Sequence, residues 1–252
     1  MISKELTIIT SHYRDLEGLL STWQSIKKQT YKKWKWIIVD SYTYNFKSLL
    51  PKDLLSNNSI NIYQLDSSIY DAMNFGILQT KTDFYHFLNC NSSYTSETIL
   101  EEIFLILNND ANSKKFLHTF KMNIINKNIN YIQSPTKFKF PYTSGHESTI
   151  FPSIRKDKIL IRSYIGLIAD MIFMFEYSLY FKIKPYQMSF VNYPKGGYSD
   201  SVSLTKDKIK GYSIFFLILL LRGKLIQSAI TIYRILGELK VLIKNEIKNL
   251  ND

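Results

Sequence analysis

Short apolar runs alternate with amphipathic stretches along the first third of the chain. Residues 5–10 (ELTIIT) and 34–40 (WKWIIVD) are short and rich in β-branched or aromatic side chains, which favours strands. Between them, residues 16–29 place apolar side chains three and four positions apart, the spacing of an amphipathic helix. A strand, a helix and a second strand in succession predict a βαβ unit with parallel strands in a twisted sheet.

The same alternation continues farther along the chain. Residues 60–65 predict a third strand, apolar spacing across residues 69–77 predicts a helix, and the aromatic run 84–88 predicts a buried strand. Polar clusters lie before this helix, at residues 66–68, and directly after this strand, at residues 89–93. Because ligands of open α/β sheets bind beyond the carboxyl ends of the strands, these clusters indicate a ligand site.

The pattern is less regular in the second half. Residues 95–112 predict an amphipathic helix, capped by Thr95 or Ser96 with Glu97 close behind. The later elements are two short β-like pieces, an apolar helix and a strand with a turn, at residues 115–122, 124–132, 171–181 and 190–198.

From residue 206 onward the composition changes. Residues 214–221 (IFFLILLL) are apolar but too short to span a bilayer, which takes about 20 such residues. Beyond them, basic side chains interleave with aliphatic ones at helical spacing, which is typical of a membrane-surface anchor or a partner helix. The alternative is a helix packed on its own domain or on a second subunit. We favour the membrane surface.

Composition narrows the choice of partners. The 252 residues are 45% hydrophobic and 15% aromatic, which excludes disorder for most of the chain. The net charge of +11 suits an anionic partner, either nucleic acid, an acidic membrane leaflet or a phosphorylated substrate. The single Cys90 excludes an internal disulfide and fits a reducing compartment. The first residues carry no long apolar stretch and predict a strand, not a signal peptide.

Several strings of residues resemble one enzyme family. IYDAMNFGI at residues 69–77 and FYHFLNCNSSY at residues 84–94 resemble the IYDAMNKGI and FLNSGD or FLNADD strings of family-2 glycosyltransferases. Residues 7–10 (TIIT), 29–31 (QTY) and 36–40 (WIIVD) are similar to the opening of that family. These inverting enzymes move a sugar from a nucleotide diphosphate to an acceptor.

The resemblance covers roughly residues 6–200 and implies a fold. We expect an α/β protein of the GT-A (Rossmann-like) type, a doubly wound mixed sheet with C-terminal amphipathic helices. Residues 1–205 would form the glycosyltransferase domain, with a nucleotide-sugar half at 1–94 and an acceptor half at 95–205. Residues 206–252 would form a basic helical extension.

The resemblance also implies donor-binding residues. Asp40 would accept a hydrogen bond from the nucleobase, although an aspartate at a strand end also commonly caps the next loop. The family's STDGT string is absent after Asp40, so the details of base and ribose recognition stay open. An exposed helix face is the alternative for Asp71 and Asn74. The expected donor side comprises Thr10, His12, Asp40, Asp66, Asp71, Asn74, Asn89 and Asn91.

The family's metal position differs here. Relatives carry aspartates that bind Mn²⁺ or Mg²⁺, whereas this chain has Asn91 and Ser92. Hard cations prefer carboxylate oxygen, so metal affinity should fall. Three outcomes follow: a weak site completed by diphosphate and water, a metal-free enzyme that uses Lys, Arg or backbone donors, or an inactive relative.

The acceptor side is implied by three further strings. The LIAD string at residues 167–170 resembles a family segment whose aspartate is the general base, which would be Asp170; a helix cap is the alternative, and both roles can coexist. His146 and Glu147 match the family's His-Gln pair, although a lone histidine is more often structural. Gly196 and Gly197 match a turn beside the diphosphate, with Lys195 as a candidate cation, although Gly-Gly is also an ordinary turn.

We therefore expect an inverting hexosyltransferase that uses a nucleotide sugar, with a UDP-sugar favoured. Its acceptor would be a saccharide or an undecaprenyl-linked saccharide of capsule, O-antigen or exopolysaccharide synthesis, at the inner face of the bacterial plasma membrane. A non-catalytic relative that has lost its metal site is the alternative. A nucleic-acid-binding protein is disfavoured, because the basic residues alternate with aliphatic ones and form no stacking platform. A homo-oligomer is left open.

Overall fold

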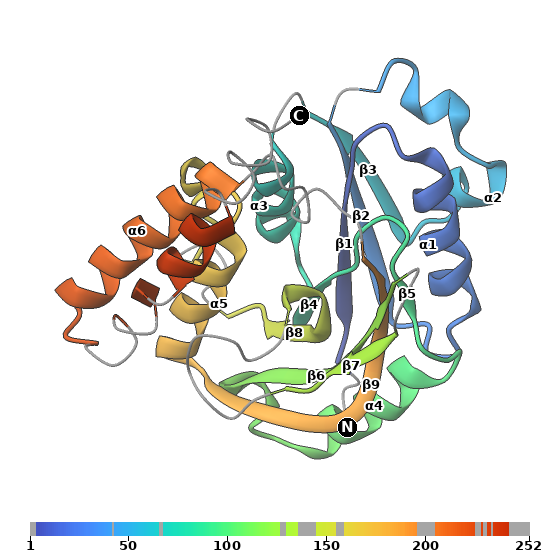
Figure 1. Cartoon of the computed structure of the whole chain (residues 1–252). Coiled ribbons are helices and arrows are strands. Elements are labelled where there is room, and N and C mark those ends of the chain that lie inside the picture. Colours follow the sequence, from blue (N-terminus) through green and yellow to red (C-terminus); the bar gives the residue numbers. More distant parts are fainter. Residues whose placement is uncertain are drawn as a thin grey trace.

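The computed structural model describes residues 4–41, 43–65, 68–126, 130–135, 145–154, 159–195 and 205–224, together with 228, 231, 232 and 234–241. Within these residues, nine strands form one sheet in the order β3-β2-β1-β4-β8-β6-β9-β5, and β7 pairs with β6 (Figure 1). The strands are β1 (Leu6–His12), β2 (Trp34–Asp40), β3 (Ile60–Gln64), β4 (Phe84–Phe87), β5 (Ser93–Tyr94), β6 (Phe116–Ile125), β7 (Tyr131–Gln133), β8 (Thr149–Pro152) and β9 (Lys182–Pro194). The α-helices are α1 (Leu16–Lys28), α2 (Lys52–Leu55), α3 (Ile69–Gln79), α4 (Ile99–Asn109), α5 (Ala169–Tyr180) and α6 (Thr205–Leu221), and the short 3₁₀ turns are η1 (Phe46–Leu49), η2 (Ser113–Lys115), η3 (His146–Ser148) and η4 (Ser163–Ile165).

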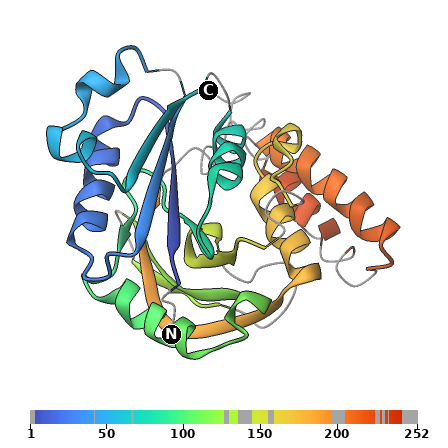
Figure 2. The ribbon, with the colours of Figure 1, turned by 180° about the vertical axis from the view of Figure 1, so that it is seen from behind.

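The first half is the predicted parallel sheet. Strands β3, β2, β1 and β4 lie parallel, and the register places His12 opposite Asp40 at the carboxyl ends of β1 and β2. Helices α1, α2 and α4 cover one face, where the ring of Trp23 stacks on that of Trp36 with centroids 5.5 Å apart. Helices α3, α5 and α6 cover the other face, as Figures 1 and 2 show from opposite sides. The doubly wound mixed sheet expected from the sequence is therefore confirmed.

The second half turns the sheet into a mixed one. β8 is antiparallel to both β4 and β6, β9 is parallel to β6, and β5 is antiparallel to β9. The pairing of β6 with β9 shifts register between Thr119 and Met122, a bulge-type irregularity that bends strands. The two long strands curve below the rest of the sheet in Figure 1. Near its carboxyl end, β9 pairs with β5, which begins within the polar cluster after β4 where the ligand site was expected.

Several predicted boundaries were wrong. Helix α4 begins at Ile99 after Thr98, not at Thr95 or Ser96, because Thr95 bonds instead to the backbone of β9, through Ser189 and Phe190. The stretch 124–132 is not one strand, since β6 ends at Ile125 and β7 is Tyr131–Gln133. The strand predicted at 190–198 is the end of β9, which begins at Lys182.

Helix α6 contributes to the core of the protein. Phe215 and Leu219 are fully buried, and the ring of Phe215 meets that of Phe175 on α5 at 5.5 Å. On another side of the helix, Leu217 and Leu221 are 56% and 88% exposed. Among the described residues, no helix has both the length and the apolar character needed to cross a membrane. One side of α6 thus packs on its own fold, and a second apolar side faces outward.

Candidate active site

A buried carboxylate lies at the end of β2. Asp40 Oδ1 accepts hydrogen bonds from His12 Nδ1 at 2.6 Å and from the Thr43 hydroxyl at 2.7 Å. Its Oδ2 accepts from the Thr43 backbone N–H at 2.7 Å and from the Gln64 amide at 3.0 Å. A carboxylate has about four acceptor positions, so this set fills them. Asp40 is fully buried and, in this arrangement, acts as a loop cap.

The neighbouring donor candidates are also engaged inside the fold. The Thr10 hydroxyl donates to the Leu88 carbonyl at 2.6 Å and accepts from the Trp36 indole N–H at 2.8 Å. His12 is buried and stacks on Phe46 with ring centroids 4.6 Å apart. The base contact predicted for Asp40, and the donor binding predicted for Thr10 and His12, stay predictions. Two aromatic side chains that sequence reasoning did not single out, Tyr13 and Tyr44, are 64% and 85% exposed beside these strand ends.

Asp71 and Asn74 on α3 are both hydrogen-bonded within the fold. Asp71 Oδ2 accepts the Ser68 hydroxyl at 2.6 Å, and this bond lowers the pKa of Asp71 despite partial burial. The amide of Asn74 donates to the Ile161 carbonyl and accepts from the Ile161 N–H, both at 2.7 Å. Asn74 thus pins the segment that leads to α5. Asp66, which was predicted to lie near these two, is outside the described residues.

The loop after β4 carries the predicted metal position. The Asn91 amide donates to Asp15 Oδ2 at 2.7 Å, and the Asn89 amide donates to Glu147 Oε1 at 2.7 Å. Ser92 is buried, and its hydroxyl has no hydrogen-bond partner within the part of the chain that the structure describes. Each nearby carboxylate therefore binds an amide, and the described residues contain no group of three or more His, Cys, Asp or Glu that could hold a metal ion. This donor set does not fit Mn²⁺ or Mg²⁺, which favour carboxylate oxygens.

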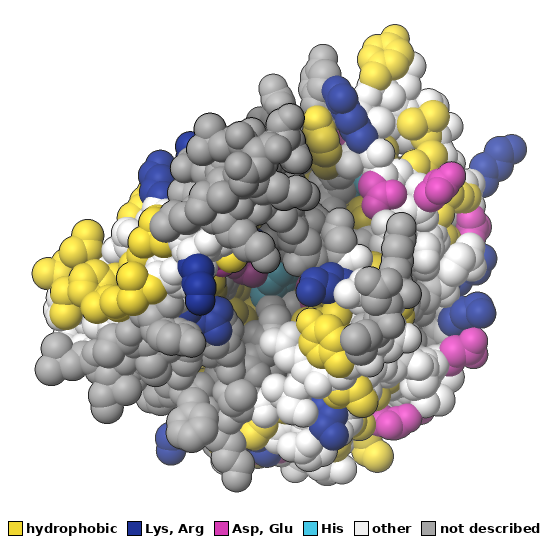
Figure 3. All heavy atoms as spheres, in the orientation of Figure 1, with side chains coloured by type: hydrophobic (Ala, Val, Ile, Leu, Met, Phe, Trp, Pro, Cys, Tyr) yellow, Lys and Arg dark blue, Asp and Glu magenta, His cyan; other side chains and the backbone are white. Residues whose placement is uncertain are grey.

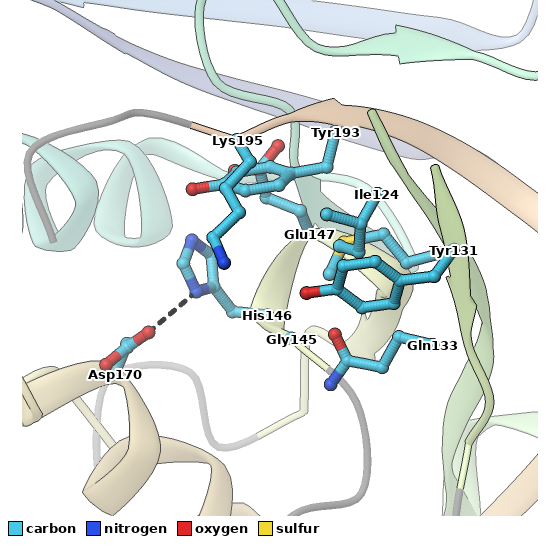
Figure 4. A pocket seen from close by; sticks show the side chains of 10 residues that line it. Ile124, Tyr131, Gln133, Gly145, His146, Glu147, Asp170, Tyr193 and Lys195 are labelled. Carbon is cyan, nitrogen blue, oxygen red and sulfur yellow. Dashed lines mark hydrogen bonds and ion pairs between the residues drawn. The ribbon is translucent and has the colours of Figure 1, made fainter. Parts of the chain in front are cut away.

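A cavity of about 280 Å³ lies at the carboxyl ends of β6 and β9, beside β7 and η3 (Figure 4). This volume is near the lower end of the ~300–1,000 Å³ usual for small-molecule sites. The cavity brings together acceptor-side residues predicted from three separate stretches: His146 with Glu147, Asp170, and Lys195. It is lined by Met122, Ile124, Tyr131, Gln133, Gly145, His146, Glu147, Asp170, Tyr193 and Lys195.

Asp170 lies in the first turn of α5 and points into this cavity. Its Oδ1 accepts from the Met171 backbone N–H at 2.8 Å, and its Oδ2 lies 3.1 Å from His146 Nδ1. The side chain is 31% exposed, and from the described residues it takes only these two hydrogen bonds of the roughly four that a carboxylate can accept. Asp170 therefore keeps the capacity to accept a proton from a bound hydroxyl group.

His146 connects the loop after β4 to Asp170. Its Nε2 lies 3.4 Å from the Asn89 amide nitrogen, while its Nδ1 faces Asp170. Burial by itself would lower the pKa of His146, but the hydrogen bond and charge of Asp170, with the charge of Glu147, raise it above its ordinary value. The hydrogen bond from His146 Nδ1 to Asp170 holds the carboxylate in a fixed orientation.

Lys195 and two tyrosines complete the cavity. Figure 4 shows the Lys195 side chain extending toward the His146 ring, and Tyr131 and Tyr193 lying on the β-strand side. Gly196 and Gly197, predicted to lie in the same turn, are outside the described residues. Sequence reasoning missed Tyr131, Gln133 and Tyr193. The polar Gln133 directly after the alternating run 124–132 was the available signal for them.

Comparisons with known proteins point to one fold. No protein-family model and no curated protein matches this sequence. Among solved structures, S. aureus TarS is similar with a TM-score of 0.65 at 11% identity, over 86% of this chain and 40% of that one. TarS 1–349 in complex with UDP-GlcNAc gives 0.65 at 11% identity, over 83% of this chain and 66% of that one. The complex of the same fragment with UDP gives 0.60 at 11% identity.

The chain thus has a mixed α/β fold similar to that of TarS. It spans 40% of the longer TarS chain and about two thirds of the 1–349 fragment. Identity this low carries the fold alone, so activity has to be argued from the residues of the site.

Proposed function

We propose that the chain transfers a sugar from a nucleotide-diphosphate donor to a hydroxyl group held in the Asp170 cavity. The observation that carries the proposal is the open carboxylate of Asp170, which faces a cavity beyond the strand ends of this fold. The resemblance of IYDAMNFGI and LIAD to family-2 glycosyltransferases supports the same activity. The TarS complexes with UDP-GlcNAc and UDP favour a UDP-sugar as the donor.

In the proposed reaction, Asp170 is the general base. An acceptor hydroxyl in the cavity gives its proton to an open position of the Asp170 carboxylate as its oxygen attacks the anomeric carbon. The bond from that carbon to the diphosphate breaks on the opposite side, which inverts the anomeric configuration. His146 keeps Asp170 aimed at the hydroxyl and is a positioning residue.

The test is release of nucleoside diphosphate from a panel of UDP-, GDP- and dTDP-sugars in the presence of saccharide acceptors. Asp170→Asn should lower turnover by about 10²–10⁴, the usual contribution of a general base, without unfolding the protein. Asp207→Asn is the matched control, because Asp207 is an exposed carboxylate in the first turn of another helix. Turnover of Asp170→Asn equal to that of Asp207→Asn would contradict the assignment.

A non-catalytic binding protein is the second candidate, and the amides at the family's metal position favour it. A binding protein would retain nucleotide sugars yet release no nucleoside diphosphate with any acceptor. The same panel, measured by calorimetry as well as by product release, separates the two candidates.

We further propose that the acceptor is a saccharide or an undecaprenyl-linked saccharide, used at the inner face of the bacterial plasma membrane in capsule, O-antigen or exopolysaccharide synthesis. The outer side of α6 supports this, because Leu217, Leu220 and Leu221 are 56%, 40% and 88% exposed and lie next to Arg222 and Lys224. Apolar side chains beside basic ones fit an anionic lipid surface.

Vesicle sedimentation tests this docking. The wild-type protein should sediment with phosphatidylglycerol vesicles and much less with phosphatidylcholine vesicles. Leu217→Gln combined with Leu221→Gln should abolish sedimentation, whereas Leu105→Gln, an equally exposed leucine on α4, should not. Equal sedimentation of both variants would overturn the proposal.

A further inference from the structure

In the loop after β4, two asparagine amides donate hydrogen bonds to the carboxylates that a cation would otherwise bind. Asp15 and Glu147, the two carboxylates bonded by this loop, each receive an asparagine N–H. An amide donor supplies such a carboxylate with a hydrogen bond, as a metal ion would supply it with a coordination bond. The two asparagines thus occupy the carboxylate oxygens that a hard cation would require.

The backbone of this loop is held as firmly as its side chains. The buried Thr22 hydroxyl on α1 lies 3.1 Å from the Asn89 carbonyl and 3.0 Å from the Ser92 carbonyl. The Asn91 N–H donates to the Gly18 carbonyl at 3.0 Å. A Cβ on Gly18 would lie 2.2 Å from Asp15 Oδ2 and 2.4 Å from Asn91 Nδ2, so this pair packs directly on the helix. The amides are therefore built into the loop.

A cation is available on the other side of the cavity. Lys195 follows β9, and its backbone N–H donates to the Ile125 carbonyl at 2.8 Å. Its side chain is exposed and extends toward His146 (Figure 4). Within the described residues, Lys195 has no carboxylate partner, whereas Lys184 on the same strand is paired with Asp110 at 2.9 Å.

The surface around the cavity is also basic. Figure 3 shows basic side chains on both sides of the hollow in which a histidine is visible. A cavity bordered by basic side chains attracts an anion, and a lysine serves as a point charge for phosphate.

From these contacts we infer that Lys195, in place of a divalent metal ion, neutralises the diphosphate of the donor, so that nucleotide-sugar binding is independent of metal. The inference rests on the proposed function, because it concerns the donor of that reaction. It names the group that stabilises the leaving diphosphate: the Lys195 ammonium donates hydrogen bonds to phosphate oxygens as the anomeric bond breaks.

Calorimetric titration with UDP and with UDP-GlcNAc tests the inference. Each titration is run on full-length protein with Mn²⁺, with Mg²⁺ and with EDTA. The same Kd under all three conditions is the expected result. Lys195→Gln should then weaken binding by about 10- to 100-fold, the equivalent of one charged hydrogen bond. Lys182→Gln is the matched control, since it removes an exposed lysine at the opposite end of β9.

The outcomes separate the inference from the proposed function. Binding that appears only with Mn²⁺ or Mg²⁺ would overturn the inference and leave the glycosyltransferase proposal intact. Metal-independent binding that Lys195→Gln and Lys182→Gln weaken equally would overturn the role of Lys195. No binding of UDP, GDP, dTDP or their sugar conjugates under any condition would overturn both.

Discussion

Asp40 is the last residue of β2 and Asp170 lies in the first turn of α5, and the surroundings of these two aspartates differ. Asp40 is fully buried, and donors from His12, Thr43 and Gln64 fill its acceptor positions. Asp170 receives two hydrogen bonds from the residues that the structure describes, and its side chain is 31% exposed beside a cavity. Both carboxylates lie at the end of an element, so position alone does not distinguish them. A carboxylate with unfilled acceptor positions is the better candidate for a general base.

The largest expected contrast comes from paired substitutions. Asp170→Asn should reduce turnover by about 10²–10⁴ with little change in stability. Asp40→Asn turns two accepting positions into an N–H group that faces other donors, and each unsatisfied group costs about 1–3 kcal/mol. We expect a loss of roughly 3 kcal/mol in the free energy of unfolding and a Tm lower by about 10 °C. Urea and thermal unfolding of both variants measure their stabilities. An Asp40→Asn protein as stable as the wild type would contradict the structural role of Asp40.

Two buried histidines, His86 and His118, should make the protein less stable in acid. Burial lowers the pKa of His86 to about 3 and that of His118 to about 4, from an ordinary value of 6.5. Both rings sit between a carbonyl, which accepts from Nε2, and a tyrosine hydroxyl at Nδ1, so they are neutral. The unfolded chain binds protons more readily, so stability present above pH 6.5 is lost as pH falls toward 4.

The expected loss is on the order of 3 kcal/mol for each histidine. Urea unfolding across this pH range measures it. The slope of the unfolding free energy against pH should decrease in His118→Gln, because this substitution removes one titrating ring. An unchanged slope would contradict the role given to His118. The raised pKa of His146 works in the opposite direction, since the stability from its pair with Asp170 is lost as pH rises through that pKa.

The smallest expected effect is the loss of stability when Asn74 on α3 is replaced. Asn74 was predicted to line the donor pocket, yet both ends of its amide bond the backbone of Ile161. Asn74→Ala should cost about 2 kcal/mol of stability, because two backbone groups lose their partner. Asn109→Ala, at an exposed helix end, is the control and should cost less than about 0.5 kcal/mol. Equal unfolding free energies for the two variants would remove the structural role of Asn74.

The fold could be predicted where it follows from local periodicity. The residues of β2 and the start of α1 were predicted without error, because Trp36, Ile38 and Leu19 mark a buried strand and a helix face by spacing alone. The start of α4 was not, because Thr95 forms its hydrogen bonds with Ser189 and Phe190, far along the chain. Sequence spacing contains no information on such long-range partners.

Some residues of the candidate site could likewise be predicted from the sequence, and others could not. Asp170, His146 and Lys195 were found through motifs, and the structure brings them to one cavity. Tyr131 and Tyr193 join them only because β7 pairs with β6, and β6 with β9. The saturation of Asp40 likewise depends on Gln64, whose side chain has no sequence signature. Motifs therefore identify reactive groups, while tertiary pairing decides which of those groups are free to react.

Helix α5 links the two proposals about this protein through its length. Asp170 lies in its first turn, and Phe175, which packs on Phe215 of α6, lies about 8 Å farther along the axis. If α6 rests on a lipid surface, this rigid connection sets the height of the base above the headgroups. The length of the acceptor's lipid-linked stem, and not the pocket alone, would then select which hydroxyl reaches Asp170.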